Sequence, residues 1–173
     1  LTPSYDSYTE ISQTKRSYSL RVPYYFNIAP DRDLVVAMKY MSSRGFIYEG
    51  KYRQLIAPKI TEEDEHSLWE IETQFLFDDK ITNLNRWLID TSIELDYSEK
   101  IHLSTRYYRV SDAKYFEEIA RTNTSVKELT SHLKLSYVGK NELTAAISSE
   151  DEQLVNAGTS TYIRALEGSI SKT

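Results

Sequence analysis

The densest group of side chains that could bind a metal ion is the run Glu62, Glu63, Asp64, Glu65 and His66. Carboxylate oxygens suit hard cations such as calcium, but a calcium-binding loop places them at alternating positions around a glycine. The acidic run is contiguous, contains no DxDxDG pattern and has no second histidine nearby. We therefore interpret it as a solvated loop or the first turn of a helix, and the sequence predicts no metal and no other cofactor.

The other residue types that carry catalysis show no diagnostic spacing. His66, His102 and His132 form none of the patterns HxxxH, HxH or HExxH that zinc sites use. The absence of cysteine excludes disulfides and thiolate nucleophiles. There is also no GxGxxG, Walker A or GxSxG motif. Because triads and carboxylate pairs can converge from distant positions, an enzyme based on carboxylates stays open as the third of three functions, although a non-enzyme is favoured.

One predicted strand, Ile101–Val110, combines cations with aromatic rings. Arg106 and Tyr108 share one face, and Arg109 lies on the other. Some RNA-binding sheets stack bases on strand aromatics beside basic groups, but the RNP1 pattern of those sheets is absent. An ordinary strand face with long polar side chains is therefore the favoured interpretation.

Residues 125–143 resemble a degenerate helix-turn-helix. Thr130 stands where a small apolar residue is usual, and Lys134 stands where glycine is usual. The second helix of this motif would carry one clear cation, Lys140, whereas DNA-binding faces are strongly basic. Nucleic-acid binding, through Arg106 and Arg109 or through residues 125–143, is the alternative function.

Composition favours contact with another protein. The 173-residue chain contains 14 tyrosines, and tyrosine is enriched at protein interfaces. Its net charge is −5, yet residues 61–99 alone carry twelve acids and two bases, so the remainder is about +5. We predict a non-enzymatic protein–protein interaction module, such as a subunit or adaptor of a larger assembly, that binds another protein or itself. The candidate contact residues are Tyr25, Tyr52, Glu62, Glu63, Asp64, Glu65, Arg106, Tyr108 and Arg109.

The sequence does not identify a compartment. No apolar run approaches the roughly 18 residues of a membrane-spanning helix. This predicts a soluble chain with no membrane-spanning segment. The chain begins with Leu1 and not with methionine, which is compatible with the loss of a targeting signal.

Apolar and polar residues alternate along one predicted strand, residues 18–28, around which we expect the fold to be organised. Leu20, Val22 and Phe26 lie on its apolar face, which we expect to be buried. Pro23 lies on the other face and predicts an edge position or a bulge. The other residues predicted for the core are Leu34, Val35, Met38, Trp69, Ile71, Phe75, Leu84, Trp87, Leu88, Ile101 and Leu103.

The order of predicted elements indicates an α+β fold. Leu34, Val35, Met38 and Met41 have helical spacing, and Arg44-Gly45 would end that helix. Residues 61–77 are ambiguous between helix and strand, with strand favoured from about Ser67. The order β-α-β-β-α-β is typical of a ferredoxin-like, split βαβ core. The predicted domains are an extended arm at 1–17, the α+β core at 18–110 and a helical C-terminal segment at 111–173.

Overall fold

The structure, a computed structural model, describes residues 2–56, 67–98, 100–120, 128–139, 143–155, 161–163 and 167–172. In these residues the chain forms eleven strands and one short helix of the π type, η1 (Phe116–Ala120). The strands are β1 (Ser4–Glu10), β2 (Lys15–Ala29), β3 (Arg32–Met41), β4 (Gly45–Ile56), β5 (Ser67–Leu76), β6 (Arg86–Ser98), β7 (Ile101–Val110), β8 (Glu128–Val138), β9 (Leu143–Leu154), β10 (Thr161–Ile163) and β11 (Glu167–Lys172).

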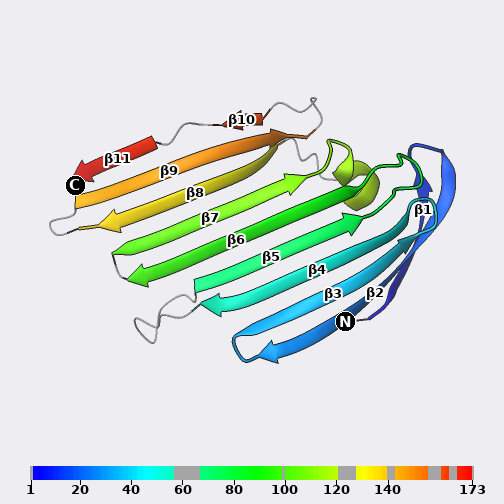
Figure 1. Cartoon of the computed structure of the whole chain (residues 1–173), viewed down its shortest axis with the longest axis horizontal. Helices are drawn as coiled ribbons and strands as arrows, with labels where there is room; N and C mark the ends of the chain where they lie inside the picture. The colour runs from blue at the N-terminus through cyan, green and yellow to red at the C-terminus, as the bar shows by residue number, and fades with distance from the viewer. Residues whose placement is uncertain are drawn as a thin grey trace.

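These strands form a single curved antiparallel sheet in which the order in space follows the order in the chain (Figure 1). Each strand from β1 to β10 is hydrogen-bonded to the next, and β11 returns to pair with β9. The β3–β4 turn depends on Gly45, whose φ of 119° is a conformation that side chains disfavour. Helix η1 lies beyond the end of β7 (Figure 1), and we call this side of the sheet the η1 end.

The predicted ferredoxin-like α+β fold is wrong. The strand predicted at 18–28 lies within β2, and the strand favoured from Ser67 is β5, but the helix predicted after Ala29 is β3. The four apolar residues taken as a helical stripe lie on both faces of β3, because the strand is apolar on both sides near its end. A pattern of four positions in eight residues fits either period, and the pair Val35-Val36 favours a strand.

The helical C-terminal segment, part of the same fold prediction, is also wrong. Residues 128–138 are β8 and residues 143–154 are β9, so the resemblance to a helix-turn-helix does not correspond to helices in the part of 125–143 that the structure describes. The division of the chain into three domains stays a prediction. One observation bears on its first boundary: β1 pairs with β2 along its whole length, from Ser4 opposite Arg21 to Glu10 opposite Lys15.

The face of β2 that was predicted to be buried is the exposed one. Leu20, Val22 and Phe26 are 43–45% exposed, whereas Ser17 and Ser19 on the opposite face of β2 are buried. The alternation was therefore identified correctly, but its apolar side faces outward. Of the other residues predicted for the core, Leu88 is buried, Met38 and Leu84 are exposed, and the remaining eight are partly buried.

The main buried apolar cluster of the described residues lies at the η1 end. Tyr115, Phe116 and Ile119, in and beside η1, pack on side chains from the ends of several strands. Those strand side chains are Tyr8, Met41, Ile47, Leu76, Leu88, Val110 and Leu129, and Val155, just after β9, also belongs to the cluster. This small core fixes the η1 segment against the sheet and leaves most of the sheet surface open on both faces.

Candidate functional site

One face of the sheet, which we call the apolar face, carries outward-pointing hydrophobic side chains over successive strands. In the register, Val22 is opposite Met38, Met38 is opposite Tyr48, and Tyr48 is opposite Phe75. Phe75 in turn is opposite Trp87 on β6, so one row of large apolar side chains crosses five strands. Exposed side chains on this face also include Leu20, Tyr24, Phe26, Phe46, Tyr107, Leu133, Leu135 and Ile147.

Aromatic rings on the apolar face are concentrated near the two ends of the strands. At the η1 end, Tyr18 contacts Tyr5 and Tyr40 with ring centroids 6.3 and 6.2 Å apart, and Tyr40 contacts Phe46 at 5.0 Å. Towards the opposite end, a second group includes Tyr24–Phe26 at 4.5 Å and Tyr52–Trp69 at 5.6 Å. The positions between them are mostly aliphatic, so the apolar face has an aliphatic middle with aromatic borders.

The other face, which we call the polar face, carries ion pairs between neighbouring strands. Arg21 is paired with Glu49 at 2.6 Å, and Lys51 with Glu70 at 2.9 Å. Arg53 donates two hydrogen bonds to Asp33, of 3.0 and 2.6 Å. These hydrogen bonds from Arg53 hold the pKa of the Asp33 carboxyl below its ordinary value.

The ion pairs explain the acidic stretch at 61–99 where the structure describes it. Glu70 on β5 is paired with Lys51 from β4, and Asp90 on β6 accepts two hydrogen bonds from Arg106 on β7. Acidic strands therefore lie between strands that supply cations. Opposite charges are interleaved on one face, and the pairing offsets the local negative charge.

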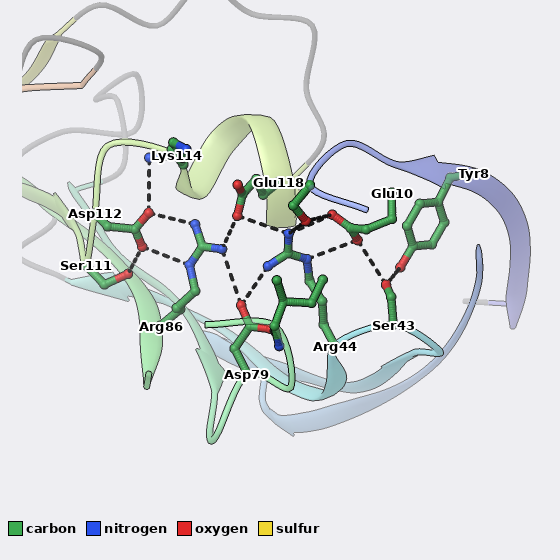
Figure 2. A network of polar contacts seen from close by, with 12 residues as sticks. Tyr8, Glu10, Ser43, Arg44, Asp79, Arg86, Ser111, Asp112, Lys114 and Glu118 are labelled. Atoms are coloured by element: carbon green, nitrogen blue, oxygen red, sulfur yellow. Dashed lines mark hydrogen bonds and ion pairs between the residues drawn. The ribbon is translucent and has the colours of Figure 1, made fainter. Parts of the chain in front are cut away.

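A buried network of ion pairs joins several strand ends to the η1 segment (Figure 2). Arg44, whose side chain is 0% exposed, donates hydrogen bonds of 3.1 and 2.6 Å to Glu10 and one of 2.6 Å to Asp79. Its Nη2 also lies 3.0 Å from Oε2 of Glu118. Ser43 donates a 2.9 Å hydrogen bond to Glu10, which adds a neutral partner to that carboxylate.

Arg86 is the second buried cation of the network. It donates two hydrogen bonds to Asp112, of 2.9 and 2.6 Å, and one of 2.6 Å to Glu118. A longer contact of 3.4 Å reaches Asp79, so Asp79 and Glu118 each bridge both arginines. Because charges are costly to bury unless they are paired and hydrogen-bonded, this network specifies how the turns at the η1 end fit together.

Burial and pairing act in opposite directions on the network carboxyls. Burial raises the pKa of Glu10, but hydrogen bonds from Arg44 and Ser43 outweigh burial and leave the pKa below 4.5. Burial likewise raises the pKa of Asp112, and hydrogen bonds from Arg86 and Ser111 bring it below 3.8. Burial also raises the pKa of the neighbouring Tyr115 phenol far above its ordinary value, and Tyr115 donates a 2.9 Å hydrogen bond to Gln74.

We expect the protein to lose stability in acid. Glu10 and Asp112 bind protons less readily in the folded chain, so their contribution is present above the unfolded pKa values and is lost as the pH falls through the lower folded values. Urea unfolding measured in steps between about pH 6 and pH 3 should give a falling free energy of unfolding. The Glu10→Gln variant should show a weaker dependence on pH, and equal slopes in the two proteins would contradict this assignment.

The structure separates the residues predicted to form one contact surface. Arg106, Tyr108 and Tyr25 lie on the polar face, where the Arg106 guanidinium stacks 4.7 Å from the Tyr108 ring centroid. Tyr52 lies on the apolar face, and Arg109 is buried in an ion pair with Asp151. Glu62, Glu63, Asp64 and Glu65 lie outside the described residues. Their role as contact residues stays a prediction.

Arg106 and Arg109 are poorly suited to nucleic-acid binding because each is already paired with a carboxylate. The sequence analysis did not identify Arg44 and Arg86 as site residues. Both pair with Asp79, which lies 35 positions from Arg44 and 7 from Arg86, and nothing in this spacing indicates that the three meet.

Within the described residues, no group of three or more His, Cys, Asp or Glu side chains is arranged to hold a metal ion. No helix in that part of the chain has the length and apolar character needed to cross a membrane.

Comparison with known proteins finds relatives that share one name. The sequence is 32% identical over 109 residues to the LPS-assembly protein LptD of Cupriavidus pinatubonensis, a match covering 63% of this chain and 12% of that protein. It is 30% identical over 131 residues to LptD of Hahella chejuensis, covering 73% and 15%. The LptD of Idiomarina loihiensis is 28% identical over 171 residues, covering 94% and 20%.

The chain thus spans between 12% and 20% of the length of these three relatives. No family model matches the sequence. The relatives share a name that describes assembly, which agrees with an interaction role and gives no support to nucleic-acid binding.

Proposed function

We propose that this chain is part of an outer-membrane LPS-assembly protein, in which its apolar face lies against lipid acyl chains and its polar face borders water. The observation that carries the proposal is the inverted alternation of β2: its apolar side is exposed from Tyr18 to Ile28, whereas Ser17, Ser19 and Pro23 on the other side are buried. The similarity to LPS-assembly proteins LptD supports the outer membrane as the membrane that the apolar face contacts. We infer that the role is non-enzymatic.

The energetic reason is the size of the apolar surface. Val22, Met38 and Tyr48 are each 45–50% exposed and lie in adjacent positions on three strands, so they form one patch and not scattered side chains. Proteins rarely expose large contiguous apolar patches to water. Acyl chains would cover such a patch, and the interior strands already satisfy their backbone groups through their neighbours, as a hydrocarbon environment requires.

The aromatic borders support the same orientation. Tyrosine and tryptophan are favoured at membrane–water interfaces, because one part of the ring system is apolar and another forms hydrogen bonds. Trp69 lies six residues before Phe75 on β5, and Trp87 is opposite Phe75 on β6. Six residues of strand span about 20 Å. With a tilt of about 40°, this separation projects to about 15 Å, so both rings lie within an apolar band roughly 25 Å tall. Strand β5 as a whole, with 10 residues, has the length of a tilted strand that crosses such a band.

The two tryptophans allow a direct test. In lipid vesicles, the fluorescence of Trp69 and of Trp87, each isolated by changing the other to phenylalanine, should be quenched by lipids brominated near the headgroup. Quenching by lipids brominated near the chain terminus should be weaker, because both residues lie at the borders of the aliphatic middle. Quenching of both by aqueous acrylamide, with no effect of brominated lipid in either variant, would show that the apolar face is not in contact with lipid.

A further inference from the structure

We propose that residues 111–120 form a strap that closes over the polar face at the η1 end and is held there by a releasable latch of ion pairs. The latch consists of the Asp112 and Glu118 carboxylates on the strap and the Arg86 and Arg44 guanidinium groups on the sheet. The strap follows β7 directly, and Figure 2 shows it lying over the buried arginines. This inference does not depend on what covers the apolar face.

The strap contacts the sheet through side chains and makes few backbone bonds to it. Its described backbone hydrogen bonds are mainly internal, from Tyr115 to Asp112 and from Glu118 to Lys114. The bond from the Ser111 amide to the Trp87 carbonyl, 2.8 Å long, is where the strap leaves the sheet. A segment attached in this way can move without breaking the hydrogen-bonded ladders of the strands.

The root of the strap is also held by side chains. Strands β7 and β8 pair only as far as Arg106 opposite His132. Beyond that point, Gln153 from β9 takes the place of a neighbouring strand: its amide accepts a 3.0 Å hydrogen bond from the Val110 amide and donates a 2.8 Å bond to the Val110 carbonyl. Ser131 accepts a 3.0 Å bond from the Tyr108 amide. The sheet next to the strap is therefore complete whether the strap is in place or not.

The charges of the network also allow the strap to be released. Without the strap, Arg44 and Arg86 face Glu10 and Asp79, two cations against two anions. Each arginine keeps a carboxylate on the sheet, so release of the strap leaves neither cation buried and unpaired. The strap adds the anions Asp112 and Glu118, which makes the closed network formally −2. Both states are electrostatically viable, as a two-state closing device needs. Opening would also expose Tyr115, Phe116 and Ile119, so their apolar packing holds the strap together with the latch.

The absence of cysteine allows the strap to be followed by thiol labelling. Ile119→Cys places a reporter on the strap itself, at a position that is fully buried between strap and sheet, and Ala120→Cys is a milder reporter at the end of the strap. In the otherwise unchanged full chain, both should react slowly with maleimide. Combining either reporter with Asp112→Asn and Glu118→Gln should raise the labelling rate on the order of tenfold or more, since hydrogen bonds to charged groups are the strong ones.

Two controls make the result decisive. Glu117→Gln removes an exposed carboxylate from the same segment and should leave the labelling rates unchanged. Ser67→Cys, buried near the opposite end of the sheet, should stay protected in every variant. Rapid labelling before the latch is altered, no acceleration in the latch variants, or parallel acceleration at Ser67→Cys would each overturn the proposal, the last because it would indicate global unfolding.

Discussion

Val22→Lys is expected to destabilise the chain in lipid by roughly 2–4 kcal/mol, as a lysine near the middle of a bilayer does. Val22 points outward from the middle of β2, and the residue opposite it on β3 is Met38. If acyl chains cover this position, the new ammonium group loses its hydration and has no carboxylate opposite it. The free energy of unfolding, measured by urea titration in lipid vesicles, should show the loss.

Tyr25→Lys provides the matched control. Tyr25 is 46% exposed and Val22 is 45% exposed, but the two lie on opposite faces of the same strand. A lysine at position 25 would face water and Asp33, to which Tyr25 donates a 3.4 Å hydrogen bond in the present structure. We expect a change within about 1 kcal/mol for this control. Equal effects of the two lysines would mean that both faces meet the same solvent, and the proposed orientation would then be wrong.

Arg44→Met should cost about 3–5 kcal/mol of stability, because it removes one partner of a buried ion-pair network. The side chains of Glu10 and Asp79 are 2% and 0% exposed, so solvent cannot replace the guanidinium. Methionine keeps much of the volume of the arginine stem and adds no polar group. Equilibrium unfolding by urea at neutral pH measures the loss.

Arg53→Met is the comparison for this second prediction. Arg53 also donates two hydrogen bonds to one carboxylate, that of Asp33, but its side chain is 47% exposed. Exposed ion pairs contribute about 0–1 kcal/mol because water and salt screen them. If Arg44→Met were no more harmful than Arg53→Met, the network at the η1 end would not be the structural joint that its burial indicates.

The sequence contained enough information to locate strands such as β2 and β5, but not to orient them. Alternation of apolar and polar residues reports that a strand has two unlike faces. Burying the apolar face is the correct expectation in water, and it misplaced Leu20, Val22 and Phe26 because the structure turns that face outward. Which face of a strand is buried depends on whether water or lipid surrounds the sheet, and the local sequence pattern does not contain that information.

The misassigned helices have a different physical cause. Helical spacing was read from short groups such as Leu34, Val35, Met38 and Met41, in a strand that is apolar on both faces near the η1 end. Met41 is fully buried in the cluster under η1 while Met38 points outward, so the two faces of β3 were merged into one apparent stripe. Cross-strand register separates them, and register is a long-range property that a window of eight residues does not contain.

The candidate site was the least predictable part for the same reason. Acidic residues between 61 and 99 appeared as an unbalanced charge, yet Glu70 and Asp90 each pair with a cation on an adjacent strand. Arg44 and Glu10 are 34 positions apart in the sequence and meet only because consecutive hairpins bring the chain back to the η1 end of the sheet. Charge pairing between strands can be inferred from sequence once the register is known, but not before.

The meander of β1 to β10 has a consequence for how such a protein can change over evolution. Every strand along this path is bonded to the strands next to it in the chain, so loss or duplication of one whole hairpin leaves the flanking strands antiparallel and able to bond. Loss of a single strand would instead make its two neighbours parallel, and a short turn cannot connect parallel strands. Related sheets are therefore expected to differ in size by two strands at a time, with the surviving ladders and both faces preserved.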